Sequence, residues 1–281
     1  MDSLTGKWLL VTGATDGLGK QVALELARRG GTLLLHGRNP QKGYEVLKEV
    51  RQINSEAPHK YYNADFASLE QVHHLAVSIK SEHDHLHILI NNAGIGGGKR
   101  GSARQTGADG YELRFTVNYL VPYLLTRSLL PLLRQSTPAA IINVASGAQA
   151  AIDFDNVMLQ KNYSGDLAYA QSKLALVAFT FTLAEELKGT GITVNALHPA
   201  TLMDTNMVRQ SGLPVKNTVA EGVNTVMHVL NMQLTENISG AYFERQEQAM
   251  AHSQAYDIAA RKKLEQLSKK LTSLQTPIKH L

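Results

Sequence analysis

Short apolar runs alternate with longer segments of helical periodicity along most of the chain. Some of the short runs are continuous, such as LLVT at 9–12 and IINV at 141–144, which is typical of strands buried on both faces of a sheet. In the longer segments apolar residues recur every three or four positions, as Val72, Leu75 and Ile79 do. The pattern predicts strands at 8–12, 32–36, 60–63, 86–91, 140–145, 193–197 and 241–243. Helices are expected at 17–29, 41–53, 69–81, 111–133, 168–188 and 218–232.

This alternation of strands and helices predicts an α/β fold. Parallel strands joined by right-handed helical crossovers form a sheet that is covered by helices on both faces. The chain has no internal repeat, low-complexity stretch or Pro/Ser-rich linker, and two segments, 96–107 and 206–217, are expected to be irregular. Residues 1–250 are therefore expected to form one doubly wound Rossmann-type domain with a mainly parallel sheet of about seven strands.

The C-terminal segment, residues 251–281, carries the basic character of the chain. The formal net charge is +4, and the six Lys/Arg and two acids after residue 254 account for all of it. Because the rest of the chain is neutral, no nucleic-acid partner is expected. Leu264, Leu267, Leu271 and Leu274 would form one apolar stripe of a helix. We expect this basic amphipathic helix to pack on its own domain or on a neighbouring subunit.

Composition excludes several classes of site and protein. Cysteine is absent, which excludes disulfides, thiolate zinc sites, iron–sulfur clusters and a cysteine nucleophile. The start, MDSLTGKWLL, lacks the basic and long apolar regions of a signal peptide. Arg127 interrupts the apolar stretch 120–133, so no membrane-spanning helix is expected. A soluble, cytoplasmic protein is the expectation.

A glycine-rich turn, TGATDGLG at 12–19, joins the first predicted strand to the first helix. Glycines allow a tight turn and a close approach of the backbone to a ligand, and the helix N-terminus offers free N–H groups to a pyrophosphate. An ordinary strand–helix turn can have the same three glycines. The position of the turn at the start of an α/β pattern favours a dinucleotide site.

The end of the second strand indicates which dinucleotide binds. An acid there would hold the ribose 2′-hydroxyl of NAD, whereas an arginine suits the 2′-phosphate of NADP. The sequence has Arg38 and no acid until Glu45. NADP(H) is therefore expected, and NAD(H) is disfavoured. Asp65, after the third strand, either accepts a hydrogen bond from the adenine amino group or caps the helix that begins near Leu69.

Two further motifs, NNAG at 91–94 and YAQSK at 169–173, complete a recognisable set. Together with the glycine-rich turn they closely resemble the short-chain dehydrogenase/reductase family, in the family's order and over roughly residues 7–243. The resemblance implies an oxidoreductase with catalytic residues Asn118, Ser146, Tyr169 and Lys173. It implies that the cofactor is bound by Gly13, Thr15, Asp16, Gly17, Leu18, Gly19, Arg38, Asn39, Asp65, Phe66, Asn92, Ala93, Gly94, Tyr169, Lys173, Pro199 and Thr201.

The chemistry of this family explains the residue types. Tyr169 and Lys173 are four positions apart on a predicted helix, so their side chains share one face. A neighbouring ammonium stabilises a phenolate and lowers the pKa of the phenol. Tyr169 would then exchange a proton with the substrate oxygen while a hydride moves between carbon and nicotinamide. By resemblance, Ser146 would hydrogen-bond the substrate oxygen and Asn118 would support a proton path beside the lysine.

The segment between Ser146 and Tyr169 resembles the retinol-dehydrogenase-like branch of the family, whose members act on lipophilic carbonyls and alcohols. A small carbonyl or alcohol is therefore the expected substrate, and the family also suggests a homo-oligomer. The alternative function is a dinucleotide-binding regulator or scaffold with little turnover. Residues 83–87 read HDHLH, but they precede the fourth strand at the edge opposite to ligand sites, so no metal site is expected and solvated histidines are predicted.

Overall fold

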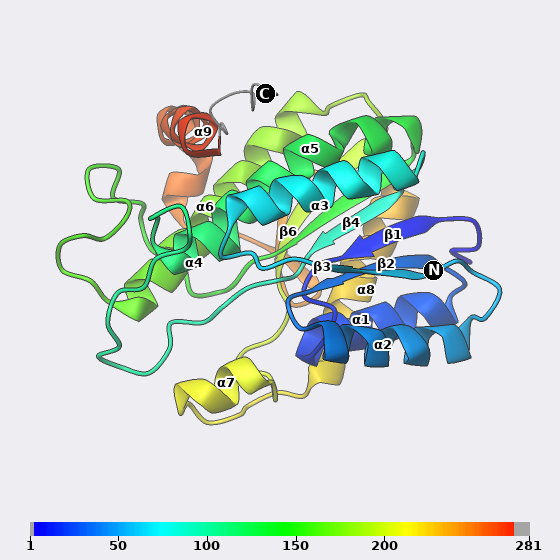
Figure 1. The fold of residues 1–281 in the computed structure, drawn as a ribbon. Coiled ribbons are helices and arrows are strands. Elements are labelled where there is room, and N and C mark those ends of the chain that lie inside the picture. Colours follow the sequence, from blue (N-terminus) through cyan, green and yellow to red (C-terminus); the bar gives the residue numbers. More distant parts are fainter. Residues whose placement is uncertain (1–2, 273–281) are drawn as a thin grey trace, which may run out of the picture.

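One eight-stranded sheet forms the centre of the protein in the computed structural model, which describes residues 3–272 (Figure 1). The strand order is β3-β2-β1-β4-β5-β6-β7-β8. All pairs are parallel except β7 with β8, which is antiparallel. The strands are β1 (Trp8–Val11), β2 (Thr32–Gly37), β3 (Lys60–Asn63), β4 (Ile88–Asn91), β5 (Ala139–Val144), β6 (Ile192–His198), β7 (Tyr242–Glu244) and β8 (Glu247–Ala249). This is the single Rossmann-type α/β domain that the sequence predicts, with one strand more than expected.

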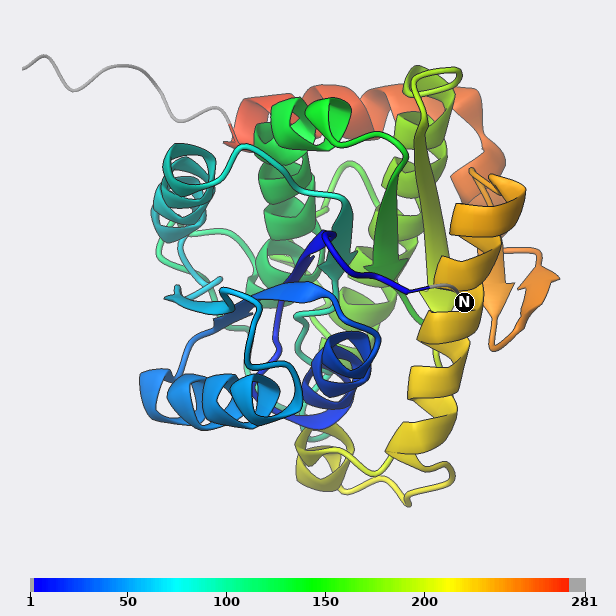
Figure 2. The same ribbon diagram turned by 90° about the vertical axis from the view of Figure 1, so that its right-hand side faces the viewer.

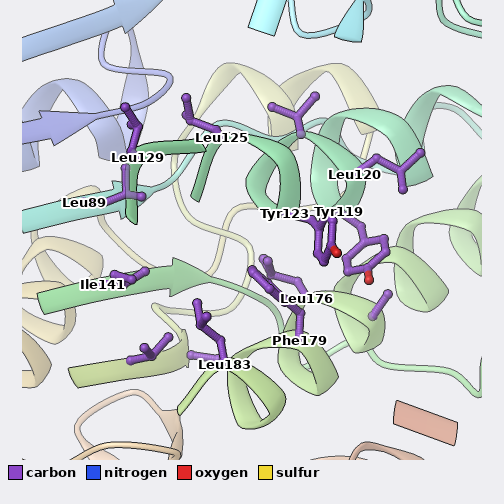
Figure 3. Close-up of a cluster of buried hydrophobic side chains, with 14 of the residues drawn as sticks. Leu89, Tyr119, Leu120, Tyr123, Leu125, Leu129, Ile141, Leu176, Phe179 and Leu183 are labelled. Carbon is purple, nitrogen blue, oxygen red and sulfur yellow. The ribbon is translucent and has the colours of Figure 1, made fainter. Parts of the chain in front are cut away.

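Helices cover both faces of the sheet (Figures 1 and 2). One face packs against α1 (Gly17–Arg28), α2 (Pro40–Ile53) and α8 (Val219–Glu236). The other face packs against α3 (Leu69–Glu82), α5 (Val121–Gln135) and α6 (Gly165–Glu186). Each face has its own cluster of buried side chains, and Figure 3 shows the part of one cluster where α5 and α6 meet β4 and β5. Every residue of β2, β4, β5 and β6 is buried, which explains their continuous apolar sequences.

The segment expected as one helix at 111–133 is divided. A short α4 (Leu113–Phe115) leads into a π-helical turn, η1 (Thr116–Leu120), and only then does α5 begin. Pro122 has no N–H with which to bond the carbonyl of Asn118, so the regular α-helical pattern cannot continue through this point. The N–H of Val121 instead bonds the carbonyl of Thr116, five residues back.

Two short elements lie where none was expected. Residues 206–217 were expected to be irregular, but they begin with α7 (Asn206–Ser211), which Thr205 caps and Gly212 ends in the left-handed conformation. Strand β8 forms a tight hairpin with β7, and Arg245 adopts a positive φ of 59° in the turn. Its residues are polar and the turn has no glycine or asparagine, so neither signal of a hairpin was present.

The C-terminal part of the described chain packs on the same domain. After a 3₁₀ turn, η2 (Ser253–Tyr256), helix α9 (Ile258–Thr272) lies against α6 and η1 (Figure 1). Leu264 is buried, and Leu267 and Leu271 pack against the same apolar cluster as α5 and α6. Leu274, the fourth residue of the predicted stripe, lies outside the described residues.

Among the described residues, α6 is long and apolar enough to cross a membrane by length and composition, rather than the segment 120–133 that the sequence pattern singled out. In its most apolar window 72% of the residues are buried inside the protein. The apolar character of α6 is therefore accounted for by its place in the core between α5 and β6.

Candidate active site and cofactor-binding site

The turns that carry the sequence motifs lie at the carboxyl ends of the parallel strands. These ends carry the glycine-rich turn after β1, Arg38 after β2, Asp65 after β3 and the 91–94 segment at the end of β4. In open α/β sheets this is the edge at which ligands bind, because the strand order reverses there. In this sheet the reversal lies between β1 and β4.

The glycine-rich turn has the geometry of a phosphate cradle. Gly13 has a positive φ of 65°, and its N–H donates to Nδ1 of His36 at 3.3 Å. A Cβ on Gly19 would lie 2.3 Å from both the carbonyl oxygen of Gly13 and Nδ2 of Asn92. Only glycine fits there, so the backbone of the turn stays close to Asn92 where α1 begins. The turn therefore fits a dinucleotide pyrophosphate.

The segment at 91–94 is tied to the glycine-rich turn through Thr12, which the sequence analysis did not single out. The hydroxyl of Thr12 accepts from the N–H groups of Asn92 and Ala93, each at 3.0 Å. Nδ2 of Asn92 donates back to the carbonyl oxygens of Thr12, at 2.8 Å, and Gly13, at 3.2 Å. Asn92 and Ala93 therefore link the end of β4 to the turn after β1 through these hydrogen bonds.

The backbone between the ends of β1, β2 and β3, where an adenosine group would lie, is held together by His36. Its ring stacks on Phe66 with centroids 3.9 Å apart, and its Nε2 bonds the carbonyl of Ala64 at 3.1 Å. Arg38 is exposed, and within the described part of the chain no hydrogen bond or ion pair engages its guanidinium. Its donors are therefore available to a 2′-phosphate.

Asp65 does not cap α3, which was one of its two expected roles. Ser68 is the N-cap of α3, and Asp109 accepts the N–H of Leu69 at 3.0 Å. The carboxylate of Asp65 accepts the N–H of Ala67 at 3.0 Å and is exposed at the end of β3. Asn39 is occupied as the N-cap of α2.

Asp16 lies at the start of α1 and contacts two residues that sequence reasoning missed. It caps the helix by accepting the N–H of Gly17 at 2.7 Å. Its other oxygen accepts from Lys42 at 3.2 Å and from Asn206 at 2.5 Å. Burial opposes ionisation, but the hydrogen bonds from Asn206, Gly17 and Lys42 outweigh it and lower the pKa of Asp16. The positive charge of Lys42 thus partly neutralises the Asp16 carboxylate, which is part of the glycine-rich turn.

Tyr169 and Lys173 project from α6 beside Ser146, which follows β5. Nζ of Lys173 lies 5.8 Å from the centre of the Tyr169 ring and donates to the carbonyl of Val144 at 2.8 Å. Burial lowers the pKa of Lys173 to about 8. Burial also raises the pKa of Tyr169, although a hydrogen bond with Ser146 acts against the rise. Burial therefore works against the lowered phenol pKa that the neighbouring ammonium predicts.

Asn118, in the π-helical turn, holds the backbone beside these groups. Its Oδ1 accepts the N–H of Ile95 at 2.8 Å, and its Nδ2 donates to the carbonyl of Ile95 and to the hydroxyl of Ser172, each at 3.0 Å. A Cβ on Gly94 would lie 3.2 Å from Oδ1 of Asn118 and 3.4 Å from Nζ of Lys173. The structure thus places Asn118 and Lys173 on the same side of Gly94, each close to its backbone.

In the turn after β6, the two residues expected to bind the cofactor also make hydrogen bonds within the protein. Thr201 hydrogen-bonds Nε2 of His198 at 3.0 Å, and the carbonyl of Pro199 accepts from Thr225 at 2.9 Å. A different threonine, Thr205, lies against the glycine-rich turn, because a Cβ on Gly17 would lie 3.1 Å from its Cγ2. Thr205 and Asn206 start α7 next to Asp16 and Gly17. Neither the apolar pattern nor a sequence motif distinguishes this pair from its neighbours in the segment 206–217.

The glycine-rich loop at 96–107, which was expected to be irregular, is anchored to the protein at its start. The buried guanidinium of Arg114 donates to the carbonyls of Gly96, at 3.0 Å, and Gly97, at 2.9 Å. It is paired with Glu112, which is also buried, and donates to the hydroxyl of Tyr163 at 2.8 Å. Arg114 thus fixes the loop against the start of α6, and its place could be found only from the fold.

The expectation of solvated histidines holds for His85 but is wrong for two others. His83 is partly buried and hydrogen-bonds Tyr62 at 2.7 Å, and His87 accepts the N–H of Trp8 at 3.1 Å. His83 contacts β3 through Tyr62, and His87 contacts β1 through Trp8, so both side chains are partly buried. Over residues 3–272 there is no group of three or more His, Cys, Asp or Glu side chains that could hold a metal ion.

Comparisons with known proteins agree on the family. The short chain dehydrogenase family model matches residues 7–214. Human retinol dehydrogenase 13 is 36% identical over 98% of this chain and 87% of its own length, and human retinol dehydrogenase 12 is 36% identical over 85% of this chain and 78% of its own length.

A solved structure of an uncharacterized protein from Mycobacterium paratuberculosis superposes with a TM-score of 0.79 at 26% identity, covering 99% of this chain and 97% of that one. A short chain dehydrogenase of Shigella flexneri, solved with NADP, shares the fold at 24% identity with a TM-score of 0.68, covering 88% of this chain and 99% of that one. The chain belongs to the short-chain dehydrogenase/reductase family of oxidoreductases, in its retinol-dehydrogenase-like branch.

Proposed function

We propose that this protein reduces a lipophilic carbonyl compound, or oxidises the corresponding alcohol, with NADP(H) as the hydride carrier. The observation that carries the proposal is the convergence of Ser146, Tyr169 and Lys173 beside a turn that fits a dinucleotide pyrophosphate. Together these groups can give the substrate oxygen a hydrogen bond and a proton while a hydride reaches the carbonyl carbon.

The residues divide the work in a way that their environment supports. When bound, NADPH would be the source of the hydride that reduces the carbonyl carbon. The hydroxyl of Ser146 hydrogen-bonds the substrate oxygen, and Tyr169 gives it a proton. Because burial raises the pKa of Tyr169, its hydroxyl is protonated near neutral pH, the form that reduction needs. In the reverse direction the Lys173 ammonium, 5.8 Å from the phenol ring, would stabilise the phenolate.

The proposal of a lipophilic substrate rests on the two segments that flank the site. Leu167 lies in the first turn of α6, two positions before Tyr169, and is 37% exposed. Met207 on α7 is 40% exposed. Met207 also reaches across to the loop after β4, because a Cβ on Gly96 would lie 3.1 Å from its Cγ. Curated relatives carry the name retinol dehydrogenase, whose substrate is a long apolar alcohol.

Replacing Tyr169 by Phe tests the proposed chemistry. Tyr169→Phe removes the proton donor and leaves the cofactor crevice intact, so kcat should fall by roughly 10²–10⁴. NADPH binding should not change. The measurement is NADPH oxidation with a panel of aldehydes and ketones, beside NADPH titration by fluorescence.

Tyr44→Phe, at a tyrosine of α2 that is 63% exposed, is the matched control and should keep full activity. Normal turnover in Tyr169→Phe would contradict the assignment. If the unmodified protein binds NADPH but no carbonyl in the panel is reduced, the regulator or scaffold function gains support instead.

The cofactor preference is tested at Arg38. Arg38→Asp should weaken NADPH binding by roughly 10–100-fold, because a charge-assisted contact to the 2′-phosphate is lost and repulsion is added. NADH, which lacks that phosphate, should be affected far less. The two dissociation constants are measured side by side, with Arg28→Asp on the outer face of α1 as the control for net charge. Equal losses for both cofactors would rule out the 2′-phosphate role.

A further inference from the structure

The C-terminal helix α9 makes a buried hydrogen bond to the π-helical turn that carries Asn118. The hydroxyl of Tyr119, the next residue, lies 2.5 Å from Oγ of Ser268, and the two residues are 149 positions apart in the chain. Tyr119 is 1% exposed and Ser268 is 0% exposed, so water cannot take the place of either partner. The hydrogen bond therefore links α9 to η1 inside the protein.

The direction of this hydrogen bond follows from the other partner of Ser268. The Ser268 hydroxyl donates its only proton to the carbonyl of Leu264 at 2.7 Å. Its oxygen is left as an acceptor, so Tyr119 is the donor. Each hydroxyl is satisfied only while both helices keep their places, and losing the acceptor would leave a phenol buried without a partner.

Helix α9 also makes hydrogen bonds to α5, which follows η1, at the next two turns. One turn after Tyr119, the hydroxyl of Tyr123 donates to Oε1 of Glu265 at 2.9 Å. One turn further, Arg127 donates to the same oxygen at 3.1 Å. Figure 3 shows the rings of Tyr119 and Tyr123 next to each other where the apolar cluster ends. Helix α9 therefore contacts η1 and the first half of α5 through several polar groups, as well as through Leu264.

A π-helical turn needs such support. Its hydrogen bonds are less favourable than those of an α-helix, and a turn of this kind persists where the surrounding structure holds it. On one side of the turn Asn118 is bonded to Ile95 and Ser172, and its Oδ1 lies close to Gly94, as does Nζ of Lys173. On the other side Tyr119 is bonded to α9.

We propose that α9 is a positioning element of the active site, and that the Tyr119–Ser268 hydrogen bond holds the π-helical turn so that Asn118 keeps Ile95 and Ser172 in place. Tyr119 and Ser268 are thus positioning residues that act through Asn118. The inference rests on the proposed function only where it predicts an effect on turnover.

A double-mutant cycle separates positioning from simple stabilisation. Ser268→Ala leaves the Tyr119 hydroxyl unpaired, and both the thermal midpoint and kcat should fall. In the double variant Tyr119→Phe/Ser268→Ala no unpaired hydroxyl is left, so the midpoint should return close to that of the unmodified protein. The kcat should stay lower by roughly five- to tenfold, while the Kd of NADPH does not change.

Hydrogen exchange gives a readout that does not depend on turnover. The N–H of Ile95 donates to Asn118, so it should exchange at least several-fold faster in the double variant. Gln266→Ala, at an exposed position of the same helix, is the control and should leave exchange at Ile95, midpoint and kcat unchanged.

Two results would overturn the proposal. One is exchange at Ile95 that is unchanged in the double variant; the other is a kcat that recovers together with the thermal midpoint. Tyr169→Phe is assayed in parallel. An active Tyr169→Phe variant contradicts the proposed function, whereas an inactive one beside a fully active double variant contradicts only the role of α9.

Discussion

His36 connects the glycine-rich turn to the strand that follows it. Its Nδ1 accepts the N–H of Gly13, so Nε2 carries the proton and donates to the carbonyl of Ala64. This arrangement needs the neutral ring, because a protonated Nδ1 cannot accept. Burial lowers the pKa of His36 to about 4, against an ordinary value of 6.5.

The lowered pKa of His36 predicts how stability depends on pH. The folded protein takes up this proton less readily than the unfolded chain. The contribution of His36 to the free energy of unfolding is therefore complete above pH 6.5 and is lost as the pH falls through about 4. Between pH 7 and pH 5 it should account for about 2 kcal/mol.

Urea unfolding at both pH values, with His36→Gln as the comparison, measures this contribution. The difference between pH 7 and pH 5 should be smaller in the variant, because the other histidines titrate equally in both proteins. An equal pH dependence in both would show that His36 keeps its ordinary pKa.

Single residues were predictable where their role depends on local spacing. Tyr169 and Lys173 share a helix face because they are four positions apart, and the glycines mark a turn whose backbone must come close to Asn92. Lys42 and Thr205 have no such local signal. They reach the crevice only because α2 and α7 begin beside the glycine-rich turn, which is a property of the fold.

At the scale of elements, the apolar pattern predicted the strands that are buried on both faces and the helices that cross between them. It failed where burial is incomplete. Strand β8 is mostly polar and lies at the edge of the sheet, where it pairs with β7 and only Ala249 packs against the apolar cluster. The π-helical turn was also missed, because apolar periodicity runs through it without a break and only Pro122 indicates an interruption.

At the scale of the whole molecule, α9 is part of the folded domain. Leu264 is 2% exposed and packs in the same cluster as α3, α5 and α6. Arg261 is also buried and pairs with Glu185 on α6 at 2.9 Å, so one of the basic residues of this helix faces inward. Lys262, Lys263 and Lys269 are exposed.

Leu264→Ala tests whether α9 and the sheet unfold together. The cavity should cost about 2–5 kcal/mol, with Lys269→Ala as an exposed control that changes stability by less than about 0.5 kcal/mol. Trp8, the single tryptophan, reports on β1 by fluorescence while circular dichroism reports on the helices. Both transitions should shift by the same amount. A shift seen only by circular dichroism would mean that α9 unfolds by itself.

The sequence alone determined the α/β class, the order of buried strands and crossover helices, and the residues whose chemistry depends on neighbours within one turn. Periodicity and spacing carry this information because they reflect which face of an element is buried. Only the tertiary structure decided which side chains from distant segments meet, such as Arg114 with the carbonyls of Gly96 and Gly97, or Tyr119 with Ser268.

The formal charge of +4 shows the same division. Counting charged residues in the sequence places the net charge in the C-terminal segment. That this segment packs on the π-helical turn, with Leu264 and Arg261 buried and the lysines of α9 exposed, depends on the fit of an apolar stripe to a complementary face. Such a match between two surfaces more than a hundred residues apart has no local signature, because each stripe alone is compatible with many partners.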